Sequence, residues 1–488
     1  MRLFALCFTT CLLIFPQFAN AQRPNILLVI ADDLGADSLN LFNGTDGTPT
    51  PTLTALSNDG VRFTNCWGSP SCSPARAQIL TGRYAFRTGV GSVGAVPDQD
   101  EGTIAQAMKA GGYATGCFGK WHLSNNSNGG DDNPNIMGFD DYRGPIGGGV
   151  QDYFSWEKVE NGTVVNGRNN PNTNYVTSET RSDAVDFINA QGDNPWFCWV
   201  AFNAPHSPLH LPPDGLHNEN PAAIAGNQRA QFLAMVEAMD IELGNILGGI
   251  ESNAARENTV VIFVGDNGTP RGVAPGVVRG SKGTLFEGGV HIPCLISGPD
   301  VVNPGRTHDA LVSLPDLFKT ILDIADLEES VIPNGAATDS LSFEPYLTDA
   351  SLESFHDCQY SERFPREGDQ LTGNDGVTIR IGNFKLLRFD NGDPDILADL
   401  PEENDNLLEG TLTADQQDAH DQLVEKLDGI RFPIGDVNRD EAVNFQDISP
   451  FINLLLSGDY QFQADINQDQ TVSFLDISPF IALLNPLS

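Results

Sequence analysis

The sequence predicts an α/β fold in which helices sandwich a large mixed, mainly parallel sheet. Three apolar runs, at residues 24–30, 195–202 and 259–265, are continuous rather than alternating, which is typical of strands buried on both faces of a parallel sheet. Helical stretches lie between such runs, for example residues 101–109 and 230–247. This alternation of strands and helices favours a sheet that is covered by helices on both faces.

The pattern changes toward the C-terminus, where we expect a smaller α+β subdomain. Residues 376–381 and 384–387 are short apolar runs joined by a Gly-Asn pair, which indicates two antiparallel strands and a tight turn. A polar helix is expected over residues 413–427. These features place the main domain at 22–339 and the subdomain at 340–430, followed by a small helical module.

The first 21 residues have the three parts of a secretory signal peptide. Arg2 precedes an apolar stretch over residues 3–15, and Ala19-Asn20-Ala21 supplies a small-residue cleavage site. No later apolar stretch has the length needed to cross a bilayer. We therefore expect residues 1–21 to be removed, and the mature chain to be secreted or periplasmic without a membrane span.

The composition limits the class of partner. The chain of 488 residues has a formal net charge of −38, which excludes nucleic-acid binding because that function needs a basic surface. The same charge should repel a polyanion at long range unless salt screens it. Six cysteines follow the signal peptide, and none has zinc-type or Cys-x-x-Cys spacing. Most are therefore expected to be small buried residues.

Acidic and amide side chains follow two of the expected central strands. Asp32 and Asp33 come just after the first strand, and Asp266 and Asn267 come just after residues 259–265. Ligands of open α/β sheets bind beyond the carboxyl ends of such strands. Three carboxylates and an amide oxygen favour Ca²⁺ or Mg²⁺ over zinc or copper. Each pair alone could equally be an ordinary turn, but the motifs around them favour a metal site.

A candidate nucleophile and several basic residues accompany these acidic pairs. Cys72 begins the sequence Cys-Ser-Pro-Ala-Arg, which ends at Arg76 and is followed by Thr-Gly-Arg at residues 81–83. We expect Cys72 to open a helix whose free N–H groups favour an anion. Basic residues can hold an anionic ester, and a histidine or lysine can protonate a departing alcohol. The candidates for these two roles, further along the chain, are Lys120, His122, His206 and Lys282.

In combination, these segments resemble the formylglycine-dependent, arylsulfatase-like sulfatases of the alkaline phosphatase superfamily, in the family's order over roughly residues 24–430. The resemblance implies that a formylglycine-generating enzyme oxidises Cys72 to an aldehyde during maturation. One hydroxyl of the aldehyde hydrate can attack sulfur, and the other can then expel sulfate. The resemblance also implies an active-site Ca²⁺, with Mg²⁺ as the alternative, bound by Asp32, Asp33, Cys72, Asp266 and Asn267.

The same resemblance implies a role for each basic residue. Arg76 should stabilise the hydrate. Lys120 and Lys282 should hold the sulfate, and Lys282 could also help to protonate the leaving group. His206 is the preferred general acid, whereas His122 should assist turnover of the sulfated intermediate. The implied activity is hydrolysis of a sulfate monoester on a carbohydrate or an aryl alcohol.

Two other functions stay open on the sequence alone. Related hydrolases share the metal site, and sometimes formylglycine, but act on phosphate or phosphonate esters. If Cys72 is not oxidised, the chain is instead a non-catalytic, calcium-dependent binding protein.

The C-terminal module, residues 435–488, contains an internal repeat. Its two copies begin 29 residues apart and share Asp-Ile-Ser-Pro-Phe-Ile. Their oxygen ligands have the spacing of a calcium loop that is followed by a helix. The expected ligands are Asp436, Asn438, Asp440, Ala442 and Asp447 in the first copy, and Asp465, Asn467, Asp469, Thr471 and Asp476 in the second.

This duplication resembles a dockerin module, which implies calcium in both loops and a cohesin-type partner. Loop position 6, where glycine is usual, is Glu441 in one copy and Gln470 in the other. A left-handed non-glycine residue costs about 1 kcal/mol, so we expect weakened calcium affinity. A stabilising tail without a partner and a plain acidic helical hairpin are the alternatives.

Overall fold

The computed structural model describes residues 23–484 apart from 43, 45–46, 168, 219–223, 253–254, 367, 402, 433–435, 438–442, 444, 458–460, 465 and 467–470. The signal peptide expected at residues 1–21 lies outside the described residues. Within the described part of the chain, no helix has both the length and the apolar character needed to cross a membrane.

The main domain is built on a ten-stranded sheet with the order β10-β2-β9-β8-β1-β7-β3-β4-β5-β6. Its strands are β1 Asn25–Ala31, β2 Gly60–Trp67, β3 Ala114–Gly119, β4 Asp141–Gly144, β5 Lys158–Glu160, β6 Thr163–Asn166, β7 Trp196–Phe202, β8 Thr259–Gly265, β9 His291–Ser297 and β10 Arg306–Ser313. The central neighbours β8, β1, β7, β3 and β4 are parallel. Antiparallel β9 lies between β8 and β2. The sheet is thus mixed and mainly parallel, which confirms the expected fold class.

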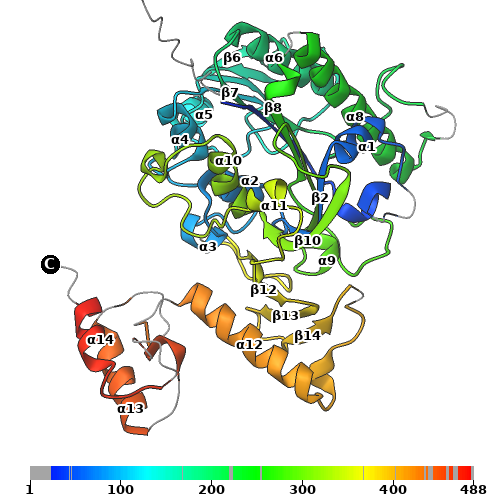
Figure 1. The fold of residues 1–488 in the computed structure, drawn as a ribbon. Coiled ribbons are helices and arrows are strands. Elements are labelled where there is room, and N and C mark those ends of the chain that lie inside the picture. The colour runs from blue at the N-terminus through cyan, green and yellow to red at the C-terminus, as the bar shows by residue number, and fades with distance from the viewer. Residues whose placement is uncertain are drawn as a thin grey trace, which may run out of the picture.

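Helices cover both faces of this sheet (Figure 1). Alternate side chains of β1 show why its apolar run is continuous: Ile26, Leu28 and Ile30 pack into one core and Leu27, Val29 and Ala31 into the other. Burying one such aliphatic side chain contributes about 1.5–3 kcal/mol. The helices of this domain are α1 Pro51–Asn58, α2 Cys72–Thr81, α3 Ala85–Thr88, α4 Ile104–Ala110, α5 Asn133–Ile136, α6 Val176–Gln191, α8 Gln228–Ser252, α9 Glu287–Val290, α10 Leu317–Ile324 and α11 Pro345–Thr348.

The smaller subdomain is an antiparallel sheet of four strands with one long helix, α12 Ala414–Arg431, against it. Its strands are β11 Gln359–Arg363, β12 Gly376–Ile381, β13 Phe384–Phe389 and β14 Ile396–Asp399. The sequence predicted β12, β13 and α12 but not the two outer strands. Gln359 fixes this sheet to the main domain, because its Nε2 donates to the carbonyl oxygens of Asn65 at 2.8 Å and Val312 at 2.7 Å.

The C-terminal module contains α13 Ile448–Ser457 and α14 Ile477–Leu484 and lies beside α12 (Figure 1). Phe451 and Phe480, which are equivalent residues of the two repeats, stack with ring centroids 4.2 Å apart. Of the expected calcium ligands, Asp436, Asp447 and Asp476 are buried, and Thr471 is also described. The other six, Asn438, Asp440, Ala442, Asp465, Asn467 and Asp469, lie outside the described residues.

The cysteines from Cys66 onward are placed as expected, since most of them are buried. Five are buried and free, namely Cys66, Cys72, Cys117, Cys198 and Cys294, and Cys358 is free and partly exposed. Cys72 lies at the carboxyl edge of the central strands, as described next.

Candidate active site

The two acidic pairs meet at the carboxyl edge of the main sheet. β1 and β8 are adjacent and parallel, with Ala31 opposite Gly265, so the residues that follow them leave the sheet together. The backbone N–H of Asp33 donates to Asp266 Oδ1 at 3.0 Å. Asp33 has a φ of 71°, a left-handed conformation that interrupts the strand's alternation of side chains. The expected convergence of both pairs is thus present.

Helix α2 carries Cys72 and Arg76 to the same point. Cys72 is the first residue of the helix, and every residue of α2 is buried. The guanidinium of Arg76, one turn later, donates to the Lys120 carbonyl at 2.7 Å and to Asp266 Oδ2 at 3.2 Å. Gly82 ends the helix with a φ of 66°, which suits glycine because it has no Cβ.

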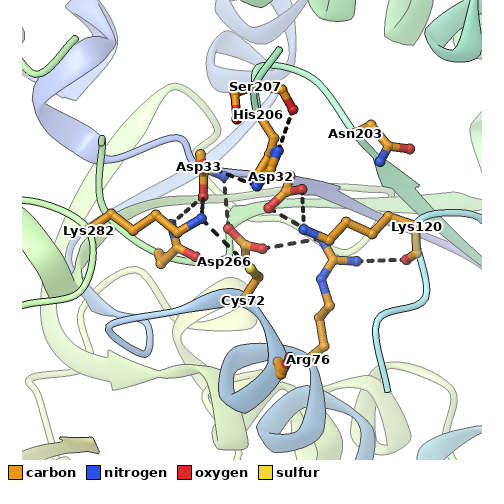
Figure 2. Close-up of polar contacts among 12 residues, drawn as sticks. Asp32, Asp33, Cys72, Arg76, Lys120, Asn203, His206, Ser207, Asp266 and Lys282 are labelled. Carbon is orange, nitrogen blue, oxygen red and sulfur yellow. Dashed lines mark hydrogen bonds and ion pairs between the residues drawn. The ribbon is translucent and has the colours of Figure 1, made fainter. Parts of the chain in front are cut away.

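Two lysines approach this centre from opposite sides (Figure 2). Lys120 Nζ lies 2.5 Å from Asp32 Oδ2. Lys282 Nζ lies 2.5 Å from Asp33 Oδ1 and 3.8 Å from Cys72 Sγ. Burial opposes the charge on Lys282, but Asp33 and Cys72 raise its pKa above the usual value. Lys282 therefore stays protonated and places a positive charge beside the candidate nucleophile.

The two histidines are placed differently. The Nδ1 of His206 lies 2.7 Å from the Ser207 carbonyl oxygen, and its Nε2 lies 3.8 Å from Asp33 Oδ2. Because a carbonyl only accepts, Nδ1 carries a proton and Nε2 faces the carboxylates. His122 has a buried Nδ1 with no hydrogen-bond partner among the described residues. Burial first, and then Lys120 and Arg76, hold its pKa well below the usual value, so His122 is a neutral imidazole.

The donor set fits a hard divalent cation. One ligand atom from each of Asp32, Cys72 and Asp266 can be chosen so that all three lie within 4.8 Å of one another. Asp32 Oδ1 and Asn267 Oδ1 are buried and accept no hydrogen bond from any described residue, although Arg76 Nη2 lies 3.9 Å from Asp32 Oδ1. Buried polar atoms without partners are rare and costly, and both atoms are oxygens of the kind that Ca²⁺ and Mg²⁺ bind. Asp33 Oδ1, in contrast, already has partners: it accepts a hydrogen bond from Asn267 Nδ2 at 2.9 Å and pairs with Lys282.

The electrostatics of the centre are consistent with this fit. Burial disfavours the charge on Asp32, but Lys120, His206 and Arg76 hold its pKa below the usual range. Burial and the neighbouring Asp32 raise the pKa of Asp266 to about 7, a cost that a cation would relieve. Burial also raises the pKa of the Cys72 thiol. The unmodified thiol is thus protonated at neutral pH and is a poor nucleophile.

The sequence did not predict that the subdomain contacts this part of the main domain. The contact is made by three buried charged residues, Lys385, Glu287 and Glu403, which we call the Lys385 cluster. Lys385 on β13 is fully buried, and its Nζ lies 3.0 Å from Glu287 Oε1 and 2.8 Å from Glu403 Oε1. The Glu287 N–H donates to Glu403 Oε2 at 2.7 Å. Glu287 begins α9, so the cluster anchors the segment that carries Lys282. A lysine inside a short apolar strand is the signal that could have revealed it, because buried lysines are nearly always paired.

Asn203 is a second residue that the sequence did not single out. It follows β7, is 1% exposed, and neither Nδ2 nor Oδ1 has a hydrogen-bond partner among the described residues. Its carbonyl accepts from Tyr153 Oη at 2.7 Å and from the His206 N–H at 2.9 Å. Figure 2 shows its amide on the same side of the centre as His206.

Comparison with known proteins identifies the family of this architecture. Residues 24–327 match the family model described as Sulfatase. The chain belongs to the sulfatase family. Mouse arylsulfatase J is 30% identical over 326 residues, which are 63% of this chain and 53% of that protein. Pig N-acetylgalactosamine-6-sulfatase is 30% identical over 371 residues, which are 68% of this chain and 67% of that protein. This sulfatase thus spans about half the length of the first relative and two thirds of the second.

Solved structures share its fold. The crystal structure of Ps i-CgsB is 25% identical with a TM-score of 0.71, covering 89% of this chain and 97% of that one. The phosphonate monoester hydrolase of Agrobacterium radiobacter has the same fold at 22% identity and a TM-score of 0.62, covering 84% of this chain and 95% of that one. Residues 434–485 match the dockerin type I domain, as the repeat indicated.

Proposed function

We propose that this sulfatase hydrolyses sulfate monoesters of a carbohydrate, or of an aryl alcohol, through formylglycine at position 72 and a bound Ca²⁺, with Mg²⁺ as the alternative ion. The observation that carries the proposal is the position of Cys72. Its sulfur is buried at the start of α2, 3.8 Å from Lys282 Nζ and next to the oxygens of Asp32 and Asp266. A carbohydrate is favoured because the N-acetylgalactosamine-6-sulfatases of pig, human and dog are among the similar proteins.

The charges around Cys72 suit a sulfate ester once a cation is bound. Arg76, Lys120 and Lys282 balance the three nearby aspartates. A divalent cation would leave the centre with a formal excess of two positive charges. Such an excess favours an anionic ester and the further negative charge that develops on its leaving oxygen.

The modified residue and the cation would supply the chemistry that the amino acids lack. Formylglycine at position 72 would provide a hydrate with one hydroxyl to attack sulfur and a second to release sulfate by C–O cleavage. A cation held by Asp32, Asp33, Asp266, Asn267 and position 72 would lower the pKa of that hydroxyl and polarise the ester.

The chain's own residues then bind the ester and move the protons. Lys120 and Lys282 hold the sulfuryl oxygens from opposite sides, and Arg76 stabilises the hydrate. His206 is the general acid: its Nδ1–H is committed to the Ser207 carbonyl, so the imidazolium donates from Nε2 toward the leaving alcohol. His122, a neutral imidazole, accepts a proton when the sulfated intermediate breaks down.

The test is a matched pair of substrates. Protein that has been co-expressed with a formylglycine-generating enzyme is assayed on 4-nitrophenyl sulfate and on a 4-nitrophenyl phosphonate monoester. We expect the larger kcat/KM for the sulfate. His206→Ala should slow the hydrolysis of sulfate esters with poor leaving groups more than the hydrolysis of 4-nitrophenyl sulfate. A clear preference for the phosphonate contradicts the proposal.

The second candidate function is hydrolysis of a phosphate or phosphonate ester. The shared fold with the phosphonate monoester hydrolase favours it, but that similarity extends to the fold alone. The substrate pair above separates the two functions directly.

For the C-terminal module we propose calcium-dependent docking to a cohesin-type partner outside the cell. The match to the dockerin type I domain supports this, as do the buried carboxylates of Asp436, Asp447 and Asp476. Apolar side chains such as Leu456 and Phe474, 77% and 76% exposed, offer a surface for a partner. Calorimetry with a cohesin should show binding in Ca²⁺ and none in EDTA, and binding that persists in EDTA would contradict the proposal.

A further inference from the structure

A cleft of about 610 Å³ lies where the main domain meets the subdomain. Its main-domain wall includes Ser71 and Lys282, and its subdomain wall includes Arg363 and Arg366. We call it the Arg366 cleft. Sites for small ligands are usually about 300–1,000 Å³ in volume, so the cleft has the size of a binding site.

The Arg366 cleft adjoins the catalytic centre. Lys282 lines it while placing Nζ 3.8 Å from Cys72 Sγ. Ser71, the residue before Cys72, also lines it. Its side chain is nearly buried, and its Oγ has no hydrogen-bond partner among the described residues. A molecule whose sulfate ester occupies the centre can therefore extend past Lys282 and Ser71 into the cleft.

Arg366 is positioned by contacts that lead back to the catalytic helix. The Phe364 N–H donates to the Gly91 carbonyl at 3.3 Å, and a Cβ on Gly91 would lie 2.3 Å from the Phe364 ring. A Cβ on Gly94 would lie 3.2 Å from Arg366 Nη1. The Gly94 N–H donates to Ser73 Oγ, within α2, at 3.2 Å. The two glycines thus allow the Arg366 segment to lie against a loop that is bonded to α2.

The charges in the Arg366 cleft suit an anion. Arg363 pairs with the buried Asp375 at 3.0 Å, and Arg366 pairs with Asp369 through Nε at 2.9 Å. Lys282, the third cation of the lining, is paired with Asp33 of the neighbouring centre, so the donors of Arg366 matter most for an anion. A guanidinium has five N–H donors, so pairing through Nε leaves the Nη donors of the half-exposed Arg366 for a ligand.

We propose that the Arg366 cleft binds a second anionic group of the substrate, a sulfate or a carboxylate on the saccharide whose sulfate ester is cleaved. The inference rests on the proposed function and narrows its substrate class to saccharides with at least two anionic groups. Arginine binds such groups through paired, charge-assisted hydrogen bonds. The Nη donors of Arg366 would also give a protein with a net charge of −38 a local contact for a polyanion that its overall charge repels.

The test compares wild type with Arg366→Gln on four substrates at low ionic strength. These are 4-nitrophenyl sulfate, a monosulfated disaccharide, and the same disaccharide with either a second sulfate or a uronic acid carboxylate. We expect wild type to favour a dianionic disaccharide by about tenfold in kcat/KM, mainly through KM, since a charge-assisted hydrogen bond is worth roughly that factor. Arg366→Gln should remove most of this preference and leave 4-nitrophenyl sulfate turnover within about twofold.

The matched control is Arg388→Gln. Arg388 is also a part-exposed subdomain arginine, paired with Asp395 at 3.0 Å, but it does not line the cleft. This substitution should leave the rates on all four substrates unchanged. Equal kcat/KM for the mono- and dianionic disaccharides, or equal effects of the two substitutions, overturns the inference while leaving sulfatase activity intact. The two dianionic substrates show whether sulfate or carboxylate is preferred.

If the enzyme turns over no substrate, the proposed function is contradicted. A binding measurement then still tests the inference. The same disaccharides are titrated into Cys72→Ala protein, with and without Arg366→Gln, by calorimetry. Tighter binding of a dianionic disaccharide that depends on Arg366 supports the Arg366 cleft as its site. Binding that is independent of the second anion or of Arg366 overturns it.

Discussion

The protein buries charged groups in two neighbouring places, and they differ in how fully the charges satisfy one another. In the Lys385 cluster, one ammonium lies within 3.0 Å of both carboxylates, and Glu403 Oε1, which accepts no hydrogen bond from the described residues, is 2.8 Å from that ammonium. At the proposed catalytic centre, Lys120 and Arg76 also pair with aspartates. Asp32 Oδ1 and Asn267 Oδ1 nevertheless accept no hydrogen bond from the described residues, and Arg76 Nη2 lies 3.9 Å from Asp32 Oδ1. The first arrangement joins two domains, whereas the second has ligand atoms to spare for a cation. Three predictions test this contrast, and a fourth extends it to a buried carboxyl outside both places.

Removing the divalent cation should have the largest effect. If the unpartnered oxygens bind Ca²⁺, dialysis against EDTA should reduce kcat by at least about a hundredfold, because electrostatic groups at the reacting atoms contribute that much. Added Ca²⁺ should restore the rate on 4-nitrophenyl sulfate. Asp447→Asn, in the C-terminal module, should behave as wild type in this assay. Full activity in EDTA would show that the spare oxygens have another purpose.

The substitution Lys282→Met should have the next largest effect on activity. Loss of the ammonium beside Cys72 and Asp33 removes a donor to the sulfuryl oxygens, so kcat/KM should fall by about 10²–10³-fold. Lys109→Met is the control, because Lys109 is an exposed lysine that pairs with Asp140. Circular dichroism should show both variants folded. A fall of less than threefold would remove Lys282 from the catalytic centre.

Lys385→Met tests the other half of the comparison. It leaves Glu287 and Glu403 buried without their counter-ion, so the free energy of unfolding should fall by about 3–5 kcal/mol. Denaturant unfolding measures this loss. The triple change Lys385→Met, Glu287→Gln and Glu403→Gln should recover most of it, since no buried charge then stays unpaired. If the triple variant is as unstable as the single one, the charges are not what holds the domains together.

The smallest effect concerns a buried carboxyl outside both places, Asp316, which lies 3.8 Å from His356 Nε2. Burial raises its pKa to about 7 from 3.8, although it accepts hydrogen bonds from the Leu341 and Ser313 N–H groups. The folded state therefore retains a proton that the unfolded chain loses near pH 4. The associated stability is complete below that pH and is lost as the pH rises through about 7. Asp316→Asn should flatten the fall in unfolding free energy over this range, and an unchanged slope would rule out Asp316 as its source.

The sequence predicted those parts of the molecule that depend on local patterns. The apolar run before Asp32 and the one before Asp266 each indicated a buried strand with acidic residues at its end. Parallel pairing of β1 and β8 then brings the two acidic pairs to one sheet edge. Likewise, the repeat that contains Phe451 and Phe480 indicated the two-helix module directly.

What the sequence did not predict depends on contacts between distant segments. No local signal says that β9 runs antiparallel between β8 and β2. Lys385 stands out as a lysine in a short apolar strand, but only the fold shows that its partners are Glu287 and Glu403. Arg366 belongs to the active-site surroundings only because Phe364 packs on Gly91. Asn203 carries no motif, and only its burial without partners distinguishes it.

The measurement that tests the account most directly is the mass of the peptide containing residue 72, from protein made by its native host. Oxidation of the cysteine to formylglycine lowers that mass by about 18 Da. We predict the lighter mass, with turnover of 4-nitrophenyl sulfate in proportion to the converted fraction. A peptide that retains the full cysteine mass in protein that still cleaves the sulfate would contradict the account.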